Sequence, residues 1–182
     1  MSNSDTYSRS ARILHWGMAA LILSLLFAGL SMIQSMQPWH LTLLGLHKSF
    51  GVVALLAVTV RLFVRLTNKV PPLPPSVPGW QQRIARFSHI LLYLAMFAMP
   101  LSGYLMQNAA GRPVDVFGLF TLPTLLPLNL ELYAIFRELH FITAWALILL
   151  VLVHIGAALH HGLIKKDGVL QAMTGTKGRS DS

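Results

Sequence analysis

The sequence predicts an all-α protein, an integral membrane four-helix bundle with both termini in the cytoplasm. Of its 182 residues, 54% are hydrophobic and only 11% are charged, whereas a soluble domain carries about a quarter charged residues. The apolar residues gather in four runs, each near the ~20 residues that a helix needs to cross ~30 Å of hydrocarbon. The basic residues flank these runs, so the net charge of +8 indicates membrane topology and not nucleic-acid binding.

The expected spans cover residues 11–33, 41–62, 87–106 and 139–163, followed by a short cytoplasmic tail at 164–182. The first run is too long for the apolar part of a signal peptide, so we interpret it as a retained span. Backbone groups must be satisfied internally within hydrocarbon, which makes helices the expected form. The connection 67–86 is proline-rich and reads as extended. In the longest connection, 107–138, the apolar stretch 117–130 is expected along the membrane interface, and residues 1–182 are expected to form a single domain.

The distribution of lysine and arginine predicts the orientation. With both termini and the second connection on one side, eleven basic residues share that side and three lie on the other. The larger set is Arg9, Arg12, Arg61, Arg65, Lys69, Arg83, Arg86, Lys165, Lys166, Lys177 and Arg179, and the smaller set is Lys48, Arg112 and Arg137. Cytoplasmic segments carry the excess of basic residues, so both termini are expected in the cytoplasm.

Histidines are the candidate functional residues. Five of the eight lie within the apolar runs: His15, His47, His89, His140 and His154. A polar ring is costly there and is usually functional, and imidazole is the usual axial ligand of haem iron. The chain has no cysteine, which excludes disulfides, thiolate iron–sulfur clusters and covalent c-type attachment. These observations predict a membrane protein with non-covalent haem. His160 and His161 follow at the inner edge of the last run, and His40 is expected in a loop.

The spacing of the histidines predicts two haems. His140 and His154 are fourteen residues apart, so on a helix they lie about 40° from each other and roughly 21 Å apart along the axis. His47 matches the depth of His140 near the outer face, and these two form one expected pair. Depth leaves the inner site open. His15 and His89 are both candidate partners of His154.

The residues beyond His154 widen this choice. His160 or His161 would match the depth of His15 at least as well as His154 does. A ligand at His161 would lie about 31 Å from His140 along the axis, which is far for electron transfer between haems and favours His154.

At these residues the sequence resembles the bacterial cytochrome b561 family, in its compact four-helix branch that includes superoxide oxidase. The matching stretches are Arg12-Ile-Leu-His15-Trp16, His47-Lys-Ser-Phe-Gly51 with Arg61 and Arg65, His89 with the turn Pro100-Leu-Ser-Gly103-Tyr104, His140 with Ala144, and His154 with His161. The resemblance implies two b-type haems, with His15 and His154 on the cytoplasmic side and His47 and His140 on the periplasmic side. It also implies a multi-pass protein of the bacterial inner membrane that oxidises superoxide in the periplasm and reduces ubiquinone.

Other residues are candidates for substrate contacts. Lys48 and Arg137 adjoin the outer ligands, where they could attract an anion or hold haem propionates; a role as cations that reach the lipid headgroups is equally compatible with the sequence. His161 lies seven residues beyond His154 on the same helical stripe. It is a candidate quinone contact and proton donor, with His89 or His160 nearby.

Two other functions remain open from the sequence. The chain could be a membrane subunit that links the quinone pool to a separate dehydrogenase or cytochrome, with 107–138 as its docking surface. It could also be a non-redox transporter or scaffold whose histidines bind metal or carry protons.

Overall fold

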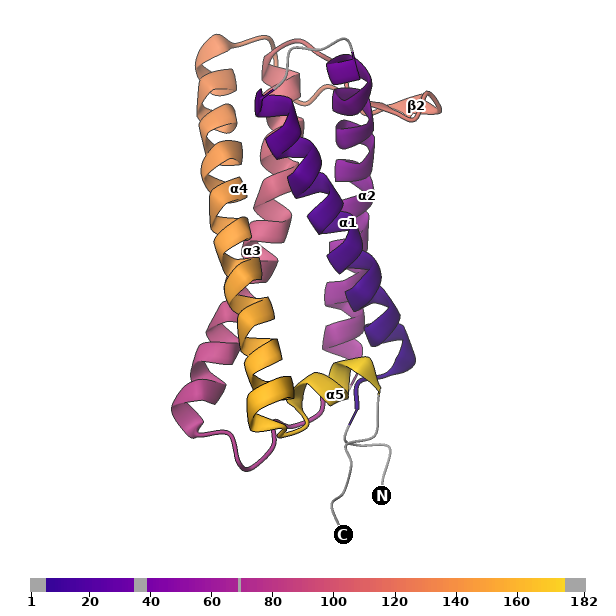
Figure 1. The fold of residues 1–182 in the computed structure, drawn as a ribbon. Coiled ribbons are helices and arrows are strands. Elements are labelled where there is room, and N and C mark those ends of the chain that lie inside the picture. The colour runs from indigo at the N-terminus through magenta and orange to yellow at the C-terminus, as the bar shows by residue number, and fades with distance from the viewer. Residues whose placement is uncertain (1–5, 35–38, 69, 176–182) are drawn as a thin grey trace.

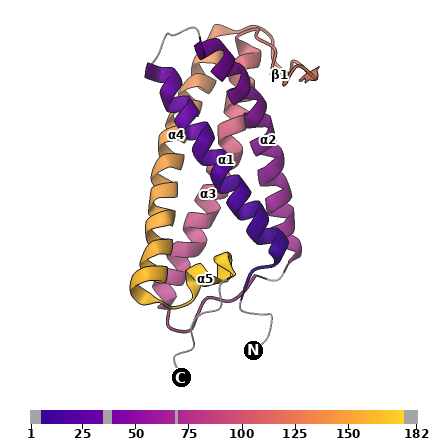
Figure 2. The ribbon, with the colours of Figure 1, turned by 45° about the vertical axis from the view of Figure 1, so that its right-hand side comes forward.

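The computed structural model describes residues 6–34, 39–68 and 70–175. Four long helices form a bundle in up-and-down order (Figures 1 and 2). They are α1 (Arg9–Gln34), α2 (Trp39–Thr67), α3 (Gly79–Ala109) and α4 (Leu130–Leu159), and α4 continues as a π-helical segment, η1 (His160–Lys165). A short helix, α5 (Val169–Thr174), crosses one end of the bundle (Figure 1). The predicted all-α membrane bundle is therefore confirmed.

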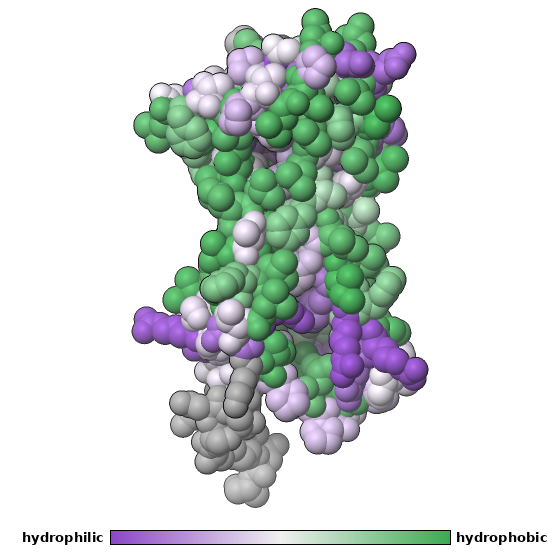
Figure 3. Space-filling model, turned by 180° about the vertical axis from the view of Figure 1, so that it is seen from behind, coloured by the Kyte–Doolittle hydropathy of each residue, from purple (hydrophilic) through white to green (hydrophobic). Residues whose placement is uncertain are grey.

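All four long helices are long and apolar enough to cross a membrane. Large apolar side chains remain exposed around the bundle, among them Phe63 at 67% and Leu149 at 63%. Figure 3 shows them as an apolar belt between more hydrophilic groups near the two ends. In water such a belt would be unfavourable, whereas hydrocarbon is its matching solvent.

The two ends of the bundle differ. The described chain ends, Thr6 and Gly175, lie at one end together with α5, and we call this the terminal end (Figure 1). At the other end, the hairpin end, β1 (Asp115–Val116) pairs antiparallel with β2 (Phe120–Thr121). The apolar segment 117–130, predicted to follow the interface, thus begins in the turn of a small hairpin and includes its second strand.

The hairpin is fixed to the bundle through the buried Ser49 of α2. The Ser49 hydroxyl accepts a hydrogen bond from the Phe117 N–H at 3.1 Å and lies 3.2 Å from the Asp115 carbonyl. Phe117 also stacks edge-on against Phe50, with ring centroids 5.1 Å apart. The hairpin is therefore held beside the residues that follow His47 on α2.

The helices extend beyond the predicted spans, chiefly at their starts. α3 begins at Gly79 instead of residue 87. It starts directly after Pro78, because proline is tolerated at the start of a helix but not in its interior. α4 begins at Leu130 instead of residue 139, because the Asn129 side chain caps it by accepting from the Leu132 N–H at 2.9 Å. Hydrophobicity locates the part of a helix in lipid, and caps locate its ends.

The structure corrects the predicted position of His40 and leaves three of the basic residues outside its described ranges. His40 lies in the first turn of α2, not in a loop, because α2 begins at Trp39. Lys69, Lys177 and Arg179, which contributed to the predicted orientation, lie outside the described residues.

The helices pack as two pairs. The most extensive backbone contacts are between α3 and α4, followed by α1 with α2, while α4 makes few close contacts with either α1 or α2. At mid-height, Leu92, Ala95 and Leu147 form a buried apolar cluster from α3 and α4, with Ile22 and Leu26 of α1 packed against it. This cluster separates the two ends of the bundle interior.

Candidate functional site

Two histidines meet on the hairpin-end side of the apolar cluster. His47 of α2 and His140 of α4 have ring centroids 6.4 Å apart. Nδ1 of His140 lies 3.0 Å from the Met99 carbonyl, to which it donates, and 3.2 Å from the Ser102 hydroxyl. With the proton on Nδ1, Nε2 of His140 is left with a free lone pair, the form in which a histidine binds a metal.

The His47 ring has a buried nitrogen that lacks a hydrogen bond. Nδ1 of His47 is buried and has no hydrogen-bond partner within the described part of the chain. An orphaned buried polar atom costs about 1–3 kcal/mol, so a ligand at this ring would relieve a real cost. Glycines leave the space around both rings: a Cβ on Gly29 would lie 3.8 Å from Cε1 of His47, and one on Gly103 only 3.0 Å from Cε1 of His140.

Three histidines meet on the terminal-end side of the cluster. The ring of His154 in α4 lies 6.1 Å from that of His15 in α1 and 5.6 Å from that of His89 in α3, measured between centroids. From α2, Arg61 points into the same level: its Nη2 lies 2.7 Å from Nδ1 of His15, and its Nε donates to the Tyr93 hydroxyl at 3.3 Å. Arg65 lies with its guanidinium carbon 5.7 Å from the centre of the Tyr93 ring.

Every long helix supplies one residue to each level, and the two are always fourteen residues apart. The pairs, written with the terminal-end residue first, are His15 and Gly29 of α1, Arg61 and His47 of α2, His89 and Gly103 of α3, and His154 and His140 of α4. Fourteen residues return a helix to nearly the same face after roughly 21 Å. The interior thus has two polar levels with apolar packing between them.

The geometry of both levels fits haem. An iron ion bonded to one nitrogen of each ring at about 2 Å on each side places ring centroids roughly 6.3 Å apart. The distances of 6.4 Å for His47 with His140 and 6.1 Å for His15 with His154 agree with this value. Both pairs also bridge α4 to helices whose backbones do not approach it closely, which leaves room for a flat macrocycle.

The remaining predicted residues are spread over the two ends. Lys48 is half-buried beside His47, and Arg137 is exposed beside His140. His160 is exposed in η1, whereas Nδ1 of His161 lies 2.5 Å from Oδ2 of Asp167. His89 lies against His154, so the structure groups it with the terminal-end level.

Two contacts were missed by the sequence analysis. Arg61 was counted only as a flanking cation, although its fourteen-residue spacing from His47 repeats that of His140 and His154 and could have indicated an inward position. The pairing of Asp167 with His161 depends on a chain reversal after η1 that has no clear sequence pattern, although Gly168 is one hint of a turn.

Comparison with known proteins identifies the family of the chain. A family model described as prokaryotic cytochrome b561 matches residues 6–176. The chain belongs to this family. Members of the cytochrome b561 family are membrane b-type cytochromes that transfer electrons and bind haem b. Haem b is a cofactor that paired histidines can hold.

Individual relatives place the chain within the cytochrome b561 family. It is 33% identical to "Cytochrome b561 homolog 2" of Escherichia coli over 97% of this chain and 95% of the relative. It is 28% identical to "Cytochrome b561 homolog 1" of the same organism, over 93% and 97%. It is also 26% identical to the "Probable superoxide oxidase CybB" of Yersinia pestis, over 80% and 81%.

Single histidine replacements test the ligand pairs. Replacing His47 or His140 by alanine should remove the same haem, and replacing His15 or His154 should remove the other, because a b-type haem here has no covalent attachment. A pyridine hemochrome assay gives the haem per chain, expected to fall from two to one in each variant. Retention of both haems in His15→Ala, with loss in His89→Ala, would instead make His89 the partner of His154.

Gly103 should be required at the hairpin-end level. Its replacement by valine would push branched carbons into the His140 ring, since a Cβ alone lies 3.0 Å from Cε1. We expect Gly103→Val to lose that haem while keeping the other, measured by absorption spectrum and hemochrome ratio. Gly45→Val is the matched control, because a Cβ on Gly45 meets nothing within 4 Å; equal loss of haem in both variants would contradict the steric argument.

Proposed function

We propose that this cytochrome b561 carries two b haems and uses them to oxidise superoxide in the periplasm and reduce ubiquinone at the cytoplasmic side. The observation that supports this most directly is the presence of two histidine levels, one near each end of a membrane-spanning bundle. Bound haems would supply one-electron carriers at both levels. The hairpin end then faces the periplasm, as the concentration of basic residues near the terminal end favours.

The proposed ligands are His47 with His140 at the hairpin end and His15 with His154 at the terminal end. The spacing of His89 to His154, 5.6 Å, is further from the roughly 6.3 Å expected for a shared iron. Arg61 bears on this choice. An arginine can only donate, so its contact at Nδ1 places the proton of neutral His15 on Nε2. Iron binding through Nε2 requires Arg61 to turn to another acceptor, and a haem propionate would provide one.

Arg61 also favours electron flow toward the terminal end. A fixed positive charge beside an iron ligand stabilises the reduced form of that iron. At the hairpin end, by contrast, the groups that hold His140 are a carbonyl and a hydroxyl, both neutral. Arg61 would thus favour reduction of a haem held at the terminal end.

At the hairpin end, Lys48 is the cation best placed to guide superoxide. It follows the proposed ligand His47 directly and is half-buried, so its field is less screened than that of the exposed Arg137. Arg112 is engaged differently, with its guanidinium carbon 5.6 Å from the centre of the Tyr133 ring.

At the terminal end, His161 is the proposed quinone contact and proton donor. It lies seven residues beyond His154 and is partly accessible, with 17% of its side chain exposed. His160, which is more exposed, is placed to exchange protons with water. His89 is less suited to contact quinone because it lies against His154.

A membrane subunit that accepts electrons from a protein donor is the second candidate. It is favoured by the hairpin, whose Leu119 and Phe120 are 79% and 54% exposed beside the level of His47. A non-redox transporter or scaffold whose histidines bind a metal ion has less support. Within the described ranges, no group of three or more histidine or acidic side chains could hold such an ion.

A two-step absorption experiment tests the function. Superoxide added to the oxidised holoprotein should reduce the haems, and ubiquinone-1 added afterwards should reoxidise them. Superoxide dismutase added first should abolish the first step. Haems that stay oxidised with superoxide would exclude direct superoxide oxidation and favour a protein donor, and haems that stay reduced with ubiquinone-1 would exclude quinone as acceptor.

Electrostatic guidance by Lys48 has its own test. Lys48→Gln should lower the second-order rate constant for haem reduction by superoxide severalfold at low ionic strength, because one attracting charge is lost. The difference should shrink in 1 M salt, where the Debye length is only about 3 Å. Lys165→Gln at the terminal end is the charge-matched control, and an equal slowing in that variant would contradict guidance by Lys48.

A further inference from the structure

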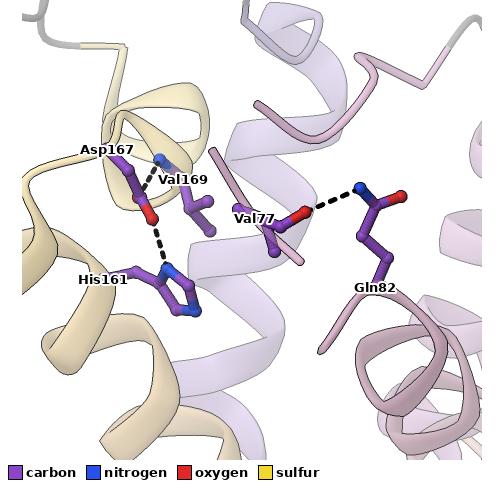
Figure 4. A network of polar contacts seen from close by, with 5 residues as sticks. All are labelled: Val77, Gln82, His161, Asp167 and Val169. Atoms are coloured by element: carbon purple, nitrogen blue, oxygen red, sulfur yellow. Dashed lines mark hydrogen bonds and ion pairs between the residues drawn. The ribbon is translucent and has the colours of Figure 1, made fainter. Parts of the chain in front are cut away.

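The chain reverses direction directly after η1 and brings a carboxylate back to His161. Lys166 adopts a left-handed conformation with φ of +52°, and Gly168 follows with φ of +90°. Between them, Asp167 places Oδ2 at 2.5 Å from Nδ1 of His161, and its Oδ1 accepts from the Val169 N–H at 3.2 Å (Figure 4). Both carboxylate oxygens are therefore occupied, and one of them orients an imidazole.

Contacts with α1 and η1 hold this reversal in place. Gly162 admits Leu170 at a distance where any side chain would collide, since a Cβ there would lie 2.9 Å from the Leu170 Cβ. The Tyr7 N–H donates to the Ala172 carbonyl at 3.0 Å, and the Trp16 indole N–H donates to the Met173 carbonyl at 3.3 Å. The position of Asp167 is thus set by packing against the bundle.

Asp167 pairs with a histidine although many arginines and lysines lie at the same end of the bundle. Among the described acidic residues, Asp115, Glu131 and Glu138 belong to the hairpin end, and Asp167 is alone at the terminal end. That end carries many permanent cations: Arg9, Arg12, Arg61, Arg65, Arg83, Arg86, Lys165 and Lys166. Asp167 nevertheless forms its ion pair with a histidine, and it is the one ion pair found in the described residues.

The pair leaves one ring nitrogen available. Because a carboxylate accepts, Nδ1 of His161 carries a proton and donates it to Asp167. Figure 4 shows the other ring nitrogen on the edge of the ring that faces away from Asp167. A carboxylate on Nδ1 orients the ring and leaves Nε2 as the nitrogen that can contact a ligand. The described groups around the ring are His160, with ring centroids 5.8 Å apart, Asp167, and the exposed Lys165 and Lys166.

We propose that Asp167 is a positioning residue for quinone reduction: it accepts from Nδ1 of His161 and orients the ring, so that Nε2 can pass a proton from water to a quinone oxygen. The proposal rests on the proposed function. Two superoxide ions each lose one electron and become O₂, and these two electrons with two protons convert the quinone to quinol. For each proton, the Nε2–H bond breaks, an O–H bond forms, and the neutral ring regains a proton from cytoplasmic water.

Steady-state reduction of ubiquinone-1 by the holoprotein tests this role. Asp167→Asn should lower kcat about 10- to 100-fold, the usual effect of removing a group that orients a functional side chain, with little change in KM for quinone. Haem content and the rate of haem reduction by superoxide should stay at wild-type values. Asp167→Glu should restore much of kcat, and Asp115→Asn, which removes the same charge at the hairpin end, should leave kcat unchanged.

A double-mutant cycle separates positioning from a structural role. His161→Gln should lower kcat at least as far as Asp167→Asn, and the two changes combined should cost no more than His161→Gln alone, because residues that act as a unit are not additive. Additive losses, loss of haem in Asp167→Asn, or a rise in KM alone would overturn the proposal. If wild-type protein reduced by superoxide fails to reduce ubiquinone-1, the proposed function itself fails.

Discussion

The cost of polar groups in hydrocarbon organises this bundle. A charged or polar side chain inside a membrane needs partners from neighbouring helices, and here those partners are gathered at two levels. The fourteen-residue spacing in every long helix makes this possible, since it returns each helix to the same face at both levels. The apolar packing around Leu92 and Leu147 then fills the interval. The proposed electron transfer along the bundle would depend on this alternation, because it sets both the separation and the insulation of the two histidine levels.

The two levels hold their histidines through different contacts. At the hairpin end, neutral groups orient His140, and glycines make the space. At the terminal end, Arg61 brings a permanent charge to His15 and to the Tyr93 hydroxyl. A cation at this level would stabilise the reduced form of a haem bound there. The sequence places that cation at the end where electrons are proposed to leave.

Periodicity and hydrophobicity were enough to predict the four helices and the depth match of His47 with His140. They act along one helix at a time, and both signals are strong in this chain. Arg61 and Asp167 could not be assigned in this way, because their roles depend on side chains from other elements. Arg61 has the same flanking position as cations that only mark topology, and Asp167 lies in a segment that hydropathy reads as a tail. The helix starts at Gly79 and Leu130 likewise depend on a proline and on a capping side chain, which act outside the lipid.

The proposed direction of electron flow has an energetic consequence. An electron that moves from the periplasm to the cytoplasm travels against an inside-negative membrane potential, at a cost of about 2.3 kcal/mol per 100 mV. The reaction between the electron donor and the quinone has to supply this free energy, and positive charge at the terminal end would lower the cost of the intermediate in which the electron rests there. Arg61 and Arg65 would lower this cost for the electron while it is at the level of His15. Asp167 fits this account, because a carboxylate that orients His161 would help protons from the cytoplasmic side reach the quinone, and these protons balance the charge of the electrons that it receives.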